Sequence, residues 1–167
     1  MITAGAEIKC DSCGATFEMD ELGTLHKKSS HAMKLSGKEE ELYIPDWYDW
    51  ERKCVNEEID AGEYSLDTRV KIEALPNSFN FVDLGEGRLI HNLNGFDLEF
   101  YNYRTDKTET LHFAPKSTIS IHTEYDYRGK GQCVTLSTLD DTFFIYPLEE
   151  GFNATKIQFA TEYLAKK

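Results

Sequence analysis

Hydrophobic residues alternate with polar residues through most of the last hundred positions of the chain. Such a two-residue period places one side of a strand against a core and the other side in water. The period recurs in seven segments: 70–74, 89–93, 96–100, 111–113, 119–127, 134–136 and 143–146. Because short connections separate these segments, we expect seven strands in an antiparallel meander.

Two local signals extend this prediction. Asn94-Gly95 lies between two alternating runs and is typical of a tight hairpin turn. After Asn153, a suitable helix cap, the apolar residues Ile157, Ala160 and Leu164 recur at helical spacing. Seven strands followed by one amphipathic helix resemble the pleckstrin-homology-like (PH-like) barrel. We therefore expect a mainly β fold, α+β overall, with a seven-stranded antiparallel PH-like barrel capped by a C-terminal helix; an open sheet with a helix across one face is the competing architecture.

A helix is also predicted between Pro45, which suits the first helical turn, and Gly62, which suits the position after the end. Trp47, Trp50 and Ile59 belong to an apolar stripe along this segment. We expect a linker helix that docks its two tryptophans on a neighbouring domain. Its acidic character leaves open a second interpretation, a docking site for a basic partner.

Charge divides the chain into three segments. Residues 1–38 have net charge 0, residues 39–67 have net charge −9 and residues 68–167 have net charge −3, which together give −12. We assign them to a zinc-ribbon-like segment, an acidic linker helix and the barrel with its C-terminal helix. Because so acidic a chain repels phosphates, we expect no nucleic-acid partner, and binding to anionic membranes is disfavoured.

The apolar stretches are too short to span a bilayer, and the first residues lack the basic end and apolar run of a secretory signal. We therefore expect a cytoplasmic protein. In that compartment the four cysteines favour metal binding or free thiols over disulfides.

The N-terminal segment contains a candidate zinc site. Cys10 and Cys13 form a Cys-x-x-Cys-Gly turn, and His26 and His31 follow at finger-like spacing. Gly23 is unsuited to a finger helix, so a ribbon hairpin with strands at 16–19 and 23–25 fits better. We predict a structural Zn²⁺ bound by Cys10, Cys13, His26 and His31, with a degenerate ribbon held by packing alone as the equal alternative.

The remaining titratable residues indicate no chemistry. His91 lies on the predicted apolar side of a strand, where a histidine is usually a hydrogen-bonded core residue. Cys54 and Cys133 are predicted to be buried, inert thiols. No nucleophile elbow and no phosphate-cradling loop occurs. We therefore predict no catalytic residues and no cofactor-binding residues.

Several motifs resemble the region downstream of the catalytic domain in Firmicute-type proteins of the lysophospholipid (1-acyl-glycerol-3-phosphate) acyltransferase family. The matching stretches, in chain order, are 8–13, 44–51, 57–64, 94–96 and 141–147. The family's catalysis requires a His-x4-Asp pair and a Glu-Gly-Thr-Arg type loop. None of the five histidines is followed by Asp at that spacing, and Glu86-Gly87-Arg88 lacks the Thr.

The resemblance thus implies an accessory region of such an enzyme without its catalytic motifs. We expect a noncatalytic interaction module whose partner is another protein or the enzyme's own catalytic domain. The alternative is a free-standing barrel that binds a small molecule or a lipid, with the tyrosines and histidines of strands 91–127 lining its pocket.

Overall fold

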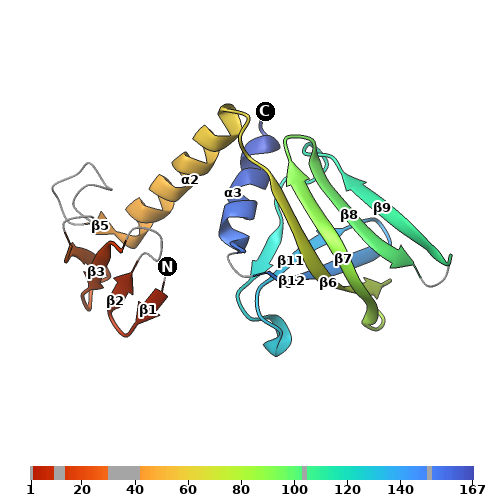
Figure 1. The fold of residues 1–167 in the computed structure, drawn as a ribbon, viewed down its shortest axis with the longest axis horizontal. Helices are drawn as coiled ribbons and strands as arrows, with labels where there is room; N and C mark the ends of the chain where they lie inside the picture. Colours follow the sequence, from red (N-terminus) through yellow and green to blue (C-terminus); the bar gives the residue numbers. More distant parts are fainter. Residues whose placement is uncertain (1, 10–13, 30–41, 103–104, 150–151) are drawn as a thin grey trace. The chain divides into compact units, whose positions relative to one another are not determined.

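The computed structural model describes residues 2–9, 14–29, 42–102, 105–149 and 152–167. The chain divides into two compact units, Met1–Lys53 and Cys54–Lys167, and the division falls within helix α2 (Ile44–Asp60). In the described residues each unit contains one antiparallel sheet, and the α-helices are α2 and α3 (Ala154–Leu164) (Figure 1). The expected mainly β, α+β composition is confirmed. No helix of the described chain is both long enough and apolar enough to cross a membrane.

The first unit is built on a small sheet whose strands follow chain order. They are β1 (Ile2–Ala4), β2 (Glu7–Lys9), β3 (Thr16–Met19), β4 (Thr24–Lys27) and β5 (Leu42–Tyr43). The core consists of Ala15, Phe17 and Leu25, against which Trp47 of α2 packs. The ring centroids of Phe17 and Trp47 are 4.8 Å apart in an edge-to-face arrangement. The zinc-ribbon character of this unit remains a prediction.

Helix α2 lies where Pro45 and Gly62 predict it. Gly62 has φ +74°, a conformation that ends a helix at low cost. Of the two tryptophans, Trp47 packs on the N-terminal core as expected, whereas Trp50 is 40% exposed. The prediction that both tryptophans dock was therefore wrong for Trp50, whose ring instead contacts Trp47 edge to face, 5.6 Å between centroids.

The second unit contains a seven-stranded antiparallel sheet in the order β10-β11-β12-β6-β7-β8-β9. The strands are β6 (Leu66–Pro76), β7 (Val82–Asn92), β8 (Gly95–Asn102), β9 (Lys107–Phe113), β10 (His122–Glu124), β11 (Cys133–Ser137) and β12 (Asp141–Pro147). Strands that follow one another in the chain pair, apart from β9 and β10. In addition β12 pairs with β6, which brings the last strand of the chain beside the first strand of this sheet. The seven antiparallel strands and the closing helix are confirmed, but β9 and β10 are edges in the described residues, so the sheet is not a closed barrel.

Inward-facing residues of all strands except β10 form the main core, as the two-residue period predicts. It includes Val70, Ile72, Leu89, Leu98 and Ile145, each fully buried. The hairpin at Asn94-Gly95 is also present. Gly95 has φ +102°, and a Cβ there would lie 2.1 Å from the carbonyl oxygen of Phe113, so this position requires glycine.

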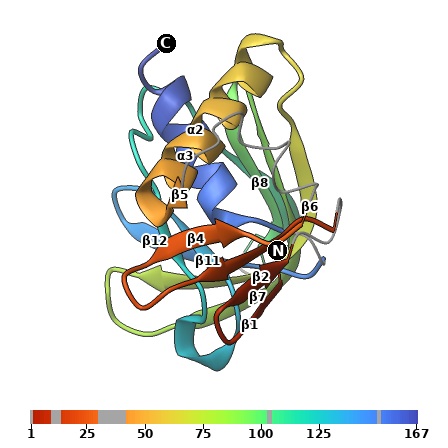
Figure 2. The same ribbon diagram turned by 90° about the vertical axis from the view of Figure 1, so that its left-hand side faces the viewer.

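Helix α3 begins after Asn153, whose side-chain oxygen accepts a hydrogen bond from the N–H of Lys156. Ala154 and Ile157 join the main core. Farther along, Phe159, Ala160 and Leu164 pack with Val55 and Ile59 of α2 and with Tyr64. Figures 1 and 2 show α3 lying beside a strongly curved sheet.

The β10–β11 connection, which contains the 3₁₀ turn Tyr127–Gly129, covers part of the outer side of the sheet. Tyr127 stacks on Phe144 at 5.0 Å between ring centroids. Glu73 is buried there, with Arg128 at 3.4 Å, an ion pair to Lys130 and a hydrogen bond from Tyr146 at 3.0 Å. Burial raises the pKa of Glu73, but the hydrogen bonds from Lys130 and Tyr146 outweigh it and hold the pKa below its usual range.

Candidate functional site

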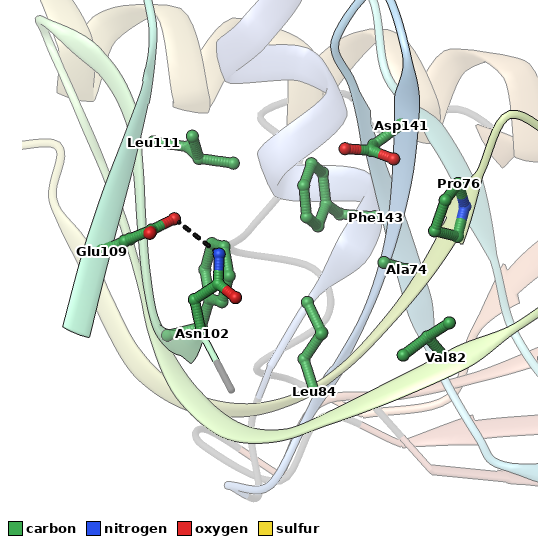
Figure 3. Close-up of a pocket in the computed structure, with 10 residues that line it drawn as sticks. Ala74, Pro76, Val82, Leu84, Asn102, Glu109, Leu111, Asp141 and Phe143 are labelled. Atoms are coloured by element: carbon green, nitrogen blue, oxygen red, sulfur yellow. Dashed lines mark hydrogen bonds between the residues drawn. The ribbon is translucent and has the colours of Figure 1, made fainter. Parts of the chain in front are cut away.

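A pocket opens at the end of the seven-stranded sheet where β8 terminates. Its volume is about 170 Å³. It is lined by Ala74 and Pro76 of β6, Val82 and Leu84 of β7, Phe100 and Asn102 of β8, Glu109 and Leu111 of β9, and Asp141 and Phe143 of β12 (Figure 3). Helix α3 packs near the opposite end of β8, where His91 pairs with Phe96 and bonds to Tyr64. The pocket therefore lies at the end of the sheet away from the helix.

An irregularity in the sheet shapes one wall of this pocket. The register of β6 and β7 shifts between Ile72 and Glu73, opposite the stretch of β7 from Asp83 to Gly85. Gly85 has φ +79°, and its N–H donates a 2.8 Å hydrogen bond to the carboxylate of Asp83. A bulge of this kind bends a strand and re-aims the neighbouring side chains. Leu84 consequently lines the pocket although it sits at the irregular point of the strand.

The polar groups of the pocket gather at its mouth. Asn102 donates a 2.9 Å hydrogen bond to Glu109 (Figure 3). The Thr105 hydroxyl donates one of 2.6 Å to the other carboxylate oxygen of Glu109. These bonds fix the orientation of Glu109. Asp141 lies on the β12 side of the mouth, and its carboxylate has no hydrogen bond or ion pair within the described part of the chain. Two carboxylates thus border an otherwise apolar floor.

Exposed hydrophobic residues stand on two loops beside this mouth. Phe79 in the β6–β7 loop is 86% exposed, and Leu139 in the β11–β12 loop is fully exposed. A 2.8 Å hydrogen bond from the Asn77 N–H to the Asp140 carbonyl joins the two loops. Phe79 lies three residues from both Pro76 and Val82, and Leu139 lies two residues from Asp141, so both loop tips adjoin residues that line the pocket.

The size of the pocket limits what it can hold. A protein cavity of about 150 Å³ accommodates one benzene molecule, whereas small-molecule sites typically span about 300–1,000 Å³. At about 170 Å³, the pocket matches one side chain or a fragment of similar size. It does not match a lipid or a cofactor.

The first unit has a second, shallower depression, of about 180 Å³. It is lined by Ile8, Leu25, Ile44, Trp47, Tyr48 and Glu51. Trp47 donates a 3.2 Å hydrogen bond from its indole nitrogen to Glu51. This depression lacks the oriented polar mouth of the pocket in the second unit.

Three of the four predicted zinc ligands, Cys10, Cys13 and His31, lie outside the described residues. His26 lies on β4, and its Nε2 is 3.1 Å from a carboxylate oxygen of Asp20. A hydrogen bond from the Thr24 N–H, together with His26, lowers the pKa of Asp20 to about 2. A carboxylate contact on one ring nitrogen is common for metal-binding histidines, and His26 is the predicted ligand for which such a contact is described. Among the described residues no group of three or more metal-ligating side chains occurs.

His91 and Cys133 are buried in the second unit, whereas Cys54 is exposed on α2. His91 is 1% exposed, bonds through Nδ1 to the Tyr64 hydroxyl at 2.8 Å and stacks on Phe96 at 3.7 Å, which confirms the core interpretation. Burial lowers the pKa of His91 to about 3. Cys133 is buried as predicted, and burial raises its pKa to about 11. Cys54 is exposed, because it lies on a different side of α2 from the buried Val55 and Ile59, so its predicted burial was wrong.

The alternative of a small-molecule barrel placed a pocket among the tyrosines and histidines of strands 91–127, but no described tyrosine or histidine lines the pocket at the end of the sheet, which was not predicted. Its lining residues are separated by up to several tens of positions, and only the curvature of the sheet brings them together. The available signal was Phe79 and Leu139, large apolar residues within polar turns. Comparison of the chain with protein-family models, with curated proteins and with solved structures finds no match.

Proposed function

We propose that this protein is a noncatalytic interaction module that holds a protein partner at the pocket end of its seven-stranded sheet. The observation that carries the proposal is a side-chain-sized pocket with exposed Phe79 and Leu139 beside it. Interfaces concentrate binding energy in a few anchors that fill such pockets, surrounded by residues that exclude water. A partner side chain in the pocket, flanked by contacts to both loop tips, fits this pattern.

The strand order supports a PH-like fold for the second unit. Four strands, β6 to β9, and three strands, β10 to β12, are joined through the β12–β6 pairing, and a C-terminal helix follows. In this proposal the edge between β9 and β10 is the open seam of the barrel. The helix and the pocket occupy opposite ends of β8, which leaves the pocket end accessible.

The resemblance to the accessory region of lysophospholipid acyltransferases suggests which partner to test first. In this proposal the partner is the catalytic domain of such an enzyme or a protein that works with it. The alternative, a free-standing barrel for a lipid or small molecule, is less well supported because the pocket is smaller than the sites that hold such ligands.

The test is quantitative binding of a purified candidate partner by calorimetry. Phe79→Ser with Leu139→Ser is expected to weaken binding at least about tenfold, because two exposed interface side chains together contribute about 1.4 kcal/mol or more. Both residues are at the surface, so folding should be unaffected. Ile119→Ser, at a residue 73% exposed on the same unit, is the matched control and should bind like the wild type.

Two results would overturn the proposal. One is equal loss of affinity in the Ile119→Ser control, which would mean that the loops are not the contact surface. The other is acyl-CoA turnover by this chain alone that a single substitution abolishes, since the proposal assigns it no catalysis. Strong binding to anionic vesicles but not to the protein partner would favour the lipid-binding alternative.

We also propose a structural Zn²⁺ at Cys10, Cys13, His26 and His31, as the spacing predicts. Four protein ligands would complete a tetrahedral site and leave no open position for catalysis. Elemental analysis of the purified protein should give one zinc per chain, and Cys10→Ser should remove it. Metal-free protein with unchanged thermal stability would support the packing-only ribbon instead.

A further inference from the structure

We propose that the anchor received by the pocket is a basic side chain, arginine or lysine, of the partner protein. The inference rests on the proposed function, because it names the chemistry of the group that the pocket takes. Two properties of the site support it: the apolar surface of the floor and the charge of the mouth.

The floor suits an aliphatic stem. Ala74, Leu84 and Leu111 provide apolar surface inside the pocket (Figure 3). Arginine and lysine bury their methylene stems on such surface while the charged end stays near water. The volume of about 170 Å³ admits a stem of this length but not a bulky ligand.

Two aromatic rings add apolar surface to the floor. Phe100 and Phe143 both line the pocket, with ring centroids 5.8 Å apart and planes tilted by 44°. Both rings are more than nine-tenths buried, so they contribute to the apolar surface under the stem and not to the charged mouth.

The mouth carries the complementary charge. Glu109 and Asp141 border it, and Asp106 and Asp140 lie on the adjoining loops. The described residues of these loops and of the pocket lining include no basic residue; Lys107 follows Asp106 at the start of β9, and Arg104 lies outside the described residues. Hydrogen bonds from Asn102 and Thr105 hold Glu109 in place, so a guanidinium or ammonium group would meet an oriented carboxylate. Asp141, which has no partner in the described part of the chain, would gain one.

The experiment is an NMR titration of the isotope-labelled full chain with two probes of nearly equal shape. N-butylguanidinium carries the cation, and N-butylurea is its neutral counterpart. We expect N-butylguanidinium to shift the amide signals of the pocket strands, and N-butylurea to bind at least about tenfold more weakly, as loss of one charge-assisted contact worth about 1.4 kcal/mol implies.

Two variants assign the effect to the mouth. Asp141→Asn is expected to weaken binding of N-butylguanidinium several-fold and to leave binding of N-butylurea unchanged. Asp126→Asn, at an exposed carboxylate of the β10–β11 connection, is the matched control and should change neither. The same comparison at two salt concentrations should show that only the cationic probe is salt-sensitive.

The outcomes separate this inference from the proposed function. If N-butylurea binds in the pocket as well as N-butylguanidinium does, the basic anchor is refuted while the interaction module stands. If neither probe shifts the pocket signals at any attainable concentration, the pocket is not an anchor site and both proposals lose their support. If Asp141→Asn leaves the affinity for N-butylguanidinium unchanged, the charge of the mouth is not what selects the ligand.

Discussion

Buried His91 should make the stability of the second unit depend on pH. The ring is 1% exposed, and burial lowers its pKa from the ordinary value of 6.5 to about 3. Between these two values the unfolded chain binds a proton that the folded protein does not bind. The free energy of unfolding therefore falls as the pH falls below the unfolded value, and it recovers as the pH rises.

The size of the effect follows from the same two values. Each unit of pKa difference corresponds to about 1.4 kcal/mol. At about pH 5, roughly 1.5 units below the unfolded value, His91 should cost the protein about 2 kcal/mol relative to neutral pH. Such a loss is a large fraction of the stability of a typical domain.

Urea-induced unfolding, followed by circular dichroism at neutral pH and at about pH 5, measures this loss. His91→Gln should be less stable than the wild type at neutral pH, because the stacking on Phe96 disappears. Between neutral pH and about pH 5, however, its free energy of unfolding should fall by about 2 kcal/mol less than that of the wild type. His112→Gln is the matched control: its side chain is 52% exposed and bonded to Asp97, and the acid-induced loss should stay close to that of the wild type.

The comparison between variants matters because other groups also respond to acid. Asp20 and Glu73 have lowered pKa values, and both contribute to acid destabilisation in every variant. If His91→Gln and the wild type lose the same free energy between the two pH values, a neutral buried His91 is refuted. The same holds if the ring of His91 titrates near its ordinary pKa in an NMR experiment.

Three further predictions concern stability. Gly95→Ala should lower the free energy of unfolding by about 3 kcal/mol or more, because strain at positive φ adds to a clash with the Phe113 carbonyl; Gly131→Ala, also at positive φ but in open space, should lose only about 1 kcal/mol, and equal losses in urea titrations would contradict the clash. Glu73→Gln should cost about 1–3 kcal/mol at neutral pH by removing charge-assisted hydrogen bonds, and the difference from the wild type should shrink as the pH falls through the lowered pKa of Glu73; a constant difference would argue against the ion pairs. Asn153→Ala should cost about 1 kcal/mol in thermal unfolding through loss of the helix cap, whereas Asn153→Asp should cost little, and equal effects would show that the cap is not stabilising.

The regular elements could be predicted from the sequence because their signals are local. Alternation marks the strands, Asn94-Gly95 marks a hairpin, and Asn153 marks the start of the last helix; the described structure contains all three. The predicted core position of His91 followed from the same alternation. Such patterns are set by the geometry of strands and helices, so one chain is enough to reveal them.

The candidate site could not be predicted in the same way. Ala74 and Asp141 line one pocket although 67 positions separate them, and no local pattern records that proximity. The bulge at Gly85 likewise interrupts the alternation in β7, where Leu84 faces the pocket. The burial of Cys54 was mispredicted because hydrophobicity alone does not determine which side of a helix meets a core.

The hydrogen bond between Asn77 and Asp140 ties two loops that belong to the first and the last strand of the sheet. The floor between them is made of strand residues, whereas the tips are made of residues that take no part in the core. Substitutions at the tips can therefore change the exposed surface beside the pocket at almost no thermodynamic cost to the framework. The strand residues of the floor must be kept for folding, whereas the residues of the two loop tips can be replaced without loss of the fold.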